Sequence, residues 1–173
     1  MKKHFAEIDS EGPDISNLQR RFWKLAVEAF EQIQEHWVSE AVSDDIEEPD
    51  DTPEYVAQDF EVDAAVAIVL AGTSISELLG QNVEVSDSMV PDISKAWQKI
   101  HGTKASQELR EFVKIYNALR HFGEPKHQIV RDITEEALCQ HFKTAQEVWV
   151  SMLQKCRRPV TSEFKHRFEF ERE

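Results

Sequence analysis

One amphipathic segment, residues 108–122, constrains the fold of this chain most strongly. Its apolar residues recur at three- and four-residue spacing, which places them on one side of a helix of about four turns; they are Leu109, Phe112, Val113, Tyr116, Leu119 and Phe122. Thr103 or Ser106 is expected to cap its start. Gly123 predicts its end, because glycine readily takes the left-handed conformation found just past a helix, and Pro125 cannot continue it.

Two longer helices are predicted before this segment. The first begins at an N-cap, Asp14 or Ser16, and runs to about Ala41, with an apolar stripe formed by Ile15, Leu18, Phe22, Leu25, Ala29, Ile33 and Trp37. The second is expected from Tyr55 to Leu79, with Gly80 as its C-cap. Its middle, residues 64–76, is apolar on nearly every side, which suits a central helix that its neighbours cross closely.

A short helix and a final long helix complete the pattern. Asp92 is expected to cap the short helix from Ile93 to Ile100, and Gly102 to end it. In the final helix Asp132 is the predicted N-cap, and Glu135 three residues later completes a capping box. That helix ends before Arg157, and its apolar stripe consists of Leu138, Phe142, Ala145, Trp149 and Met152.

These segments predict an all-α protein, an antiparallel bundle of four to five helices in one domain. The bundle covers residues 14–156, after a leader at residues 1–13, and contains an acidic loop at residues 44–54. Only the charged tail, residues 157–173, shows alternation of apolar and charged residues. The tail could add a strand, dock on a partner or stay disordered.

The composition favours a soluble, cytoplasmic protein without a cofactor. The 173 residues are 40% hydrophobic, and the longest apolar run, residues 64–71, is too short to span a bilayer. Two lone cysteines, Cys139 and Cys156, suit reduced thiols that pack as small apolar groups. The sequence has no HExxH, glycine-rich phosphate loop or GxSxG, so no metal or cofactor site is expected.

Charge is distributed unevenly along the chain, whose formal net charge is −13. Between Lys24 and Lys95 there are eighteen acidic residues and no lysine or arginine. From Lys95 to Arg131, eight basic residues oppose three acidic ones, a net charge of 8 − 3 = +5. A local basic field of this kind can attract a phosphodiester, whereas the acidic half would repel one. Acidic helices can equally be solvated faces that keep a protein soluble.

The basic segment contains a polar cluster at the end of the predicted helix 108–122. Asn117, Arg120 and His121 are spaced i, i+3 and i+4, so an amide, a guanidinium and an imidazole share one helix face. A structural explanation needs no substrate, because Arg and His in a last turn complement the negative end of the helix dipole. Binding or catalysis is the alternative explanation.

The sequence YNALRHFG, residues 116–123, resembles the motif of the HEPN superfamily (higher eukaryotes and prokaryotes nucleotide-binding). The family motif is Arg-Asn-x3-His, and Asn117 and His121 stand at its second and last positions, within a resemblance that covers residues 14–156. The resemblance implies metal-independent RNA cleavage at a homodimer interface where two motifs face each other. In that mechanism His121 would act as general acid or base, and Asn117 would position the helix end or the substrate.

The chain departs from the family at Tyr116, which stands where the motif has arginine. Arg120, one turn away, could supply the missing cation and stabilise charge on the phosphorane. Alternatively, Arg120 and His127 satisfy the looser Arg-x4-6-His spacing. Tyr116, Lys114 and His127 are the candidate substrate-binding residues.

Three functions follow from these observations. The first is a metal-independent endoribonuclease of a toxin-antitoxin or phage-defence system. The second is a catalytically inactive HEPN-fold subunit that dimerises or binds nucleic acid. The third takes the acidic half as the working surface, which would cover a basic protein as an antitoxin or nucleic-acid mimic does.

Overall fold

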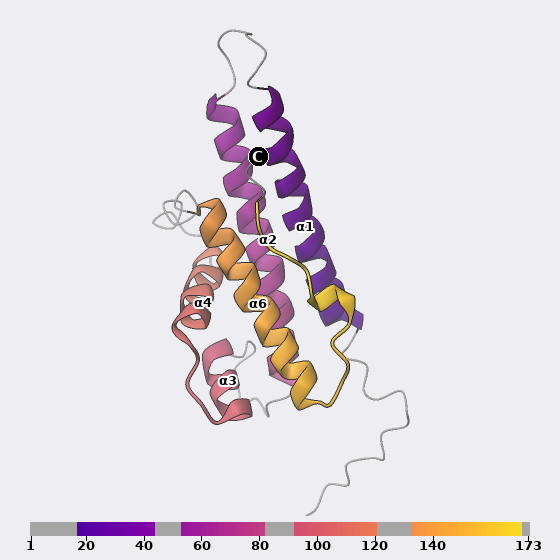
Figure 1. Ribbon diagram of the computed structural model, residues 1–173. Helices are drawn as coiled ribbons and strands as arrows, with labels where there is room; N and C mark the ends of the chain where they lie inside the picture. The colour runs from indigo at the N-terminus through magenta and orange to yellow at the C-terminus, as the bar shows by residue number, and fades with distance from the viewer. Residues whose placement is uncertain (1–16, 44–52, 82–91, 121–132, 171–173) are drawn as a thin grey trace, which may run out of the picture.

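The computed structural model describes residues 17–43, 53–81, 92–120 and 133–170, and every regular element in them is a helix (Figure 1). The helices are α1 (Asn17–Ser43), α2 (Pro53–Gln81), α3 (Ile93–His101), α4 (Gln107–Arg120) and α6 (Glu135–Lys155), with a 3-10 turn, η2 (Ser162–Phe164). Helices α1 and α2 form a long antiparallel hairpin, and α6 crosses its front beside α4 and α3 (Figure 1). The predicted all-α bundle is thus confirmed.

Local capping chemistry sets several of the helix ends. The Asp92 carboxylate accepts hydrogen bonds from the backbone amides of Ser94 and Lys95 at 3.0 and 3.2 Å, and Gly102 ends α3 in the left-handed conformation at φ 72°. Of the two residues predicted to cap α4, Ser106 does so, because its hydroxyl accepts from the amide of Leu109 at 3.1 Å. The predicted ends at Asp14, Ser16 and Gly123 lie outside the described residues.

Three predicted boundaries were wrong. Helix α2 begins at Pro53 instead of Tyr55, since proline fits the first helical position, where its missing N–H is not needed. Gly80 does not cap α2, because the helix continues to Gln81 and buries Leu78 and Leu79 in its last turns. Thr134, and not Asp132, is the N-cap of α6, and its hydroxyl accepts from the amide of Ala137 at 3.2 Å.

The apolar stripes of α4 and α6 are buried as predicted, apart from Phe122, which lies outside the described residues. Among the residues whose side chains are described, the stripe predicted for α1 is largely the wrong one, and Ile15 and the Trp37 side chain lie outside them. Helix α1 packs against the core through a neighbouring row, formed by Trp23, Ala26, Phe30 and Ile33, and only Ile33 belongs to both rows. Leu18 and Leu25 of the predicted stripe remain 55% and 42% exposed. Helix α1 therefore has two apolar faces, of which the bundle covers one.

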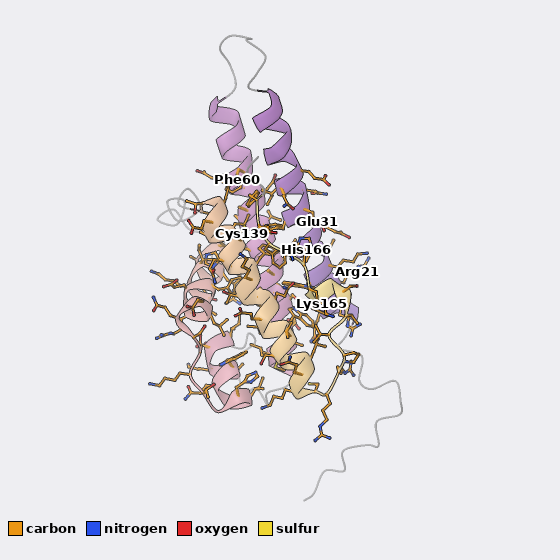
Figure 2. All side chains as sticks on the ribbon, viewed as in Figure 1. Arg21, Glu31, Phe60, Cys139, Lys165 and His166 are labelled. Carbon is orange, nitrogen blue, oxygen red and sulfur yellow. The ribbon has the colours of Figure 1, made fainter. Side chains whose placement is uncertain are left out.

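The tail docks along the front of α1 and α6 (Figure 1). Phe164 and Phe168 are buried, with the Phe168 ring 5.0 Å from the centroids of both Phe30 and Phe142. Polar contacts fix its backbone: the Trp23 indole N–H donates to the Glu163 carbonyl at 3.0 Å, and the Gln146 amide makes two bonds of 3.1 Å to the backbone of His166. His166 Nδ1 lies 3.6 Å from a carboxylate oxygen of Glu31. Figure 2 shows the two residues beside each other. None of the three alternatives predicted this arrangement: the described part of the tail forms no strand and packs against the helices of its own chain.

Helix α2 contains a segment, residues 60–80, that is long and apolar enough to cross a membrane by length and composition. The segment exceeds the apolar run at residues 64–71 because the following Gly, Ser and Thr residues carry no charge. More than half of it is buried by the other helices, and the core helix of a soluble protein passes the same test. A soluble bundle is therefore consistent with α2.

Candidate functional site

The candidate site lies at the C-terminal end of α4, where the described part of the YNALRH motif is located. Leu109, Phe112 and Tyr116 anchor α4 in the core at successive turns. Its other side is solvated, because Arg110, Lys114 and Asn117 are all exposed. The helix thus presents one continuous polar row leading to its last turn.

Tyr116 is a core residue, 3% exposed. Its ring lies directly over Gly72 of α2, where an added Cβ would come closer than 3.0 Å to three ring atoms. Its hydroxyl lies 3.5 Å from the Thr73 hydroxyl, which itself donates to the Val69 carbonyl at 2.8 Å. This packing leaves little of Tyr116, a predicted substrate-binding residue, to contact a ligand.

Arg120 lies in the last turn of α4 with its guanidinium over the Tyr116 ring, 5.3 Å from the ring centroid. This distance is within the range of a cation–π interaction, which is favoured by the negative face of an aromatic ring. The side chain is half-buried, and its charge also complements the negative end of the helix dipole. Tyr116 therefore orients the cation that follows it by one turn.

Asn117 and Arg120 share the face predicted for them, and Asn117 is exposed beside the half-buried guanidinium. Lys114 lies one turn before Asn117 and is also exposed. His121 and His127 lie outside the described residues. The last turns of α4 therefore carry an ammonium, an amide and a guanidinium at Lys114, Asn117 and Arg120, and the roles assigned to the two histidines stay predictions.

Exposed basic residues extend from this site along α4 and α3. They are Lys95, Lys99, Lys104, Arg110 and Lys114. Lys95 forms a local ion pair with the cap Asp92 at 3.7 Å, and the Arg110 side chain donates to the Ser106 carbonyl at 3.3 Å. The acidic residues of α4, Glu108 and Glu111, are in its first two turns, so positive charge dominates toward its end.

Sequence reasoning missed His141 of α6, whose ring lies against α4, the helix that carries the site. Its ring centroid lies 5.9 Å from that of Phe112, and burial lowers the pKa of the imidazole, an effect that the nearby Glu111 carboxylate opposes. Glu111 also accepts a hydrogen bond from the Gln107 amide at 2.9 Å. The available signal was the position of His141 beside Phe142 in the α6 stripe, but that position alone does not identify its partner helix.

The described residues contain no group of three or more metal-ligating side chains. The two cysteines differ in their surroundings. Cys139 is buried, and burial raises the pKa of its thiol, whereas Cys156 is exposed. The prediction that both cysteines are buried was thus wrong for Cys156, because α6 ends just before it. Neither cysteine is part of the site at the end of α4.

No protein-family model matches this sequence, and no curated protein or solved structure is significantly similar to it. Function is therefore inferred from the arrangement of residues in this chain and from the short motif at the end of α4.

Proposed function

We propose that this protein is a HEPN-like, RNA-directed protein of the cytoplasm that contacts the RNA backbone through the end of α4. The observation that carries the proposal is Arg120, held over the Tyr116 ring beside the exposed Asn117. A guanidinium oriented in this way can fork onto two phosphate oxygens, and Asn117 can donate to a third. The exposed lysines and arginine of α3 and α4 would attract the polyanion to this surface.

The packing of Tyr116 gives the departure from the family motif a physical explanation. A buried aromatic ring cannot neutralise a phosphate, so the cation must come from elsewhere on the helix. Arg120 is one turn further on, and the ring provides its support. We infer that Arg120 replaces the family arginine and that Tyr116 acts as a positioning residue.

Arg120→Ala is expected to weaken RNA binding about 10-fold or more, because a charge-assisted contact to phosphate is lost. The slope of log affinity against log salt should fall by about one. Fluorescence anisotropy with a labelled single-stranded RNA, repeated across salt concentrations, measures both quantities. Arg120→Lys keeps the charge without the fork, and an intermediate loss is expected.

The matched control is Arg110→Ala, which removes the same charge from an exposed position at the other end of α4. It should reduce the salt slope in the same way and the affinity less. Equal losses for the two variants would mean that RNA responds only to net charge, and the proposed site would be wrong.

RNA cleavage, if this site supports it, is expected to persist in EDTA and to disappear in the His121→Ala variant. The reason is that the motif supplies an imidazole for proton transfer and needs no metal. The measurement is digestion of a mixed RNA pool by wild type and variant at matched helical content. Wild-type protein that binds RNA without cleaving it would identify the inactive binding subunit, and cleavage unaffected by His121→Ala would contradict the assigned role.

A second candidate is supported by the acidic half of the hairpin. Glu35 and Asp63 are exposed, and α2 carries no lysine or arginine to neutralise them. Such a surface would cover a basic protein partner rather than RNA. The same anisotropy titration separates the candidates: binding of a lysine-rich polypeptide together with no binding of RNA would favour the acidic surface.

A further inference from the structure

The C-terminal end of α6 carries a cluster of positive charge that is distant in sequence from the basic segment at residues 95–131. Lys155 and Arg157 are exposed there, and Arg158 is half-buried. Neither Lys155 nor Arg157 forms a salt bridge with another described residue. The described part of the chain therefore leaves these two exposed charges without a carboxylate partner, and they can attract an anion.

The backbone at Arg157 is of a kind that favours glycine. Arg157 follows the last turn of α6 in the left-handed conformation, at φ 56°. Its amide donates to the Gln154 carbonyl at 3.0 Å, and the Arg158 amide donates to the Leu153 carbonyl at 2.8 Å. These two bonds form a Schellman motif, in which glycine usually takes the left-handed position because it has no Cβ. Backbone geometry thus does not explain an arginine here, and its role has to be sought in the exposed guanidinium.

The end of α6 lies next to α3, at the same end of the bundle (Figure 1). Burial lowers the pKa of His101, in the last turn of α3, and the nearby positive charge of Lys155 lowers it further. The His101 ring also stacks on Trp97, with the ring centroids 3.8 Å apart. Lys155 is therefore close to the side chains of α3, and the end of α6 and α3 belong to one surface.

This surface is the basic part of the described chain. Residues 92–120 and 155–158 contain nine lysines and arginines and three acidic residues, a net charge of 9 − 3 = +6. One of the three acidic residues, Asp92, caps α3 with its carboxylate. By contrast, α2 contains five acidic residues and no basic one. A polyanion that reaches Arg120 is therefore attracted along α4 and α3 toward the end of α6, and away from the α1–α2 hairpin.

The two ends of the basic surface are about one helix length apart. Arg120 is the last residue of α4, whereas α3 and the end of α6 lie near the start of α4 (Figure 1). The 14 residues of α4 span about 20 Å, at about 1.5 Å per residue. Nucleotides of a stacked strand are about 3.4 Å apart along its axis, so a strand of about seven nucleotides covers this length.

From these observations we infer that Lys155 and Arg157 form a second contact to the RNA backbone, and that the bound strand runs along α4 from Arg120 to the end of α6. The inference rests on the proposed function of the α4 site and names the ligand of that site more closely, as single-stranded RNA of about seven nucleotides or more. Contacts to phosphate carry no sequence information, so the second contact adds affinity without selecting bases.

The double variant Lys155→Ala/Arg157→Gly tests the second contact. It should fold like the wild type, because alanine suits the helix and glycine suits the left-handed position. Fluorescence anisotropy with labelled RNAs of four and sixteen nucleotides measures affinity and its salt dependence. For the longer RNA the affinity should fall about 10-fold, and the salt slope by about 1.4, or about 0.7 for each lost phosphate contact. The shorter RNA cannot reach both ends of the surface, and its affinity should be unchanged.

The matched control is Arg21→Ala/Lys24→Ala, which removes two exposed charges from α1, the helix that carries Arg21 in Figure 2. It should change the affinity for the longer RNA less than about twofold, because charges beyond a Debye length from the strand are screened. Arg120→Ala, in contrast, should weaken binding of both RNAs. Circular dichroism of each variant verifies that the helices are retained.

The outcomes separate the second contact from the proposed function. If Lys155→Ala/Arg157→Gly binds the longer RNA like the wild type while Arg120→Ala binds it weakly, the second contact is wrong and the α4 site stands. An equal loss in the α1 control would also overturn the second contact, since RNA would then respond only to net charge. A wild type that binds neither RNA would overturn the proposed function and, with it, this inference.

Discussion

Phe168→Ala is expected to lower the free energy of unfolding by about 3–5 kcal/mol, the usual cost of truncating a buried aromatic residue. The Phe168 side chain is 1% exposed and lies among Phe30, Phe142 and Trp23. Its removal leaves a cavity that cannot collapse easily, because the neighbouring rings are held by α1 and α6. Urea unfolding followed by far-UV circular dichroism and tryptophan fluorescence measures the change.

The neighbouring Arg167→Ala is the control for this prediction, since Arg167 is exposed on the same segment. Its effect should stay within about 0.5 kcal/mol. The two optical signals should also shift together in Phe168→Ala, because Trp23 and Trp149 lie against the docked tail. A loss below about 1 kcal/mol would show that the tail contributes little to the folded state in solution.

Gly72→Ala is expected to destabilise the protein by about 2–3 kcal/mol through overpacking. On helix propensity alone the substitution should stabilise α2, by up to about 1 kcal/mol. The sign is reversed by the Tyr116 ring, which occupies the position of the added methyl group. Chemical unfolding of the variant therefore tests the packing of α4 against α2, because the free energy of unfolding falls if the Tyr116 ring lies on Gly72 and rises if it does not.

A double-mutant cycle with Tyr116→Leu isolates this contact. The smaller side chain makes room for the methyl group, so the double variant should be more stable than the sum of the single losses predicts. Because Arg120 rests on the same ring, Gly72→Ala should also weaken RNA binding while Arg110 and Lys114 are unchanged. Additive losses of stability would mean that Gly72 and Tyr116 do not touch in solution.

Local signals in the sequence predicted those features that depend on local chemistry. Asp92, Gly102 and Ser106 act within one turn of their own positions, so their capping roles could be predicted without the fold. The stripes of α4 and α6 could be predicted because each of those helices has only one apolar face. Helix α1 has two, and periodicity alone gave no basis for choosing the row of Trp23 and Phe30.

The remaining features depend on contacts between distant parts of the chain. The alternation of charged and apolar residues in the tail did not predict that it packs on the bundle. This packing depends on hydrogen bonds that Trp23 and Gln146 donate to backbone carbonyls of the tail. At the candidate site, the shared face of Asn117 and Arg120 followed from their spacing. The close contact between the Tyr116 ring and Gly72 did not, because it depends on a glycine in another helix.

The docked tail has a consequence for the synthesis of this protein. Trp23 and Phe30, in the first helix of the bundle, are covered by residues 160–170, which are translated only after α6. A ribosome-bound chain that lacks the late segment would expose this aromatic face to solvent and to other nascent chains. The bundle can therefore complete its core only after residue 170 has emerged from the ribosome. Chaperone binding to the nascent chain should be strongest just before that point.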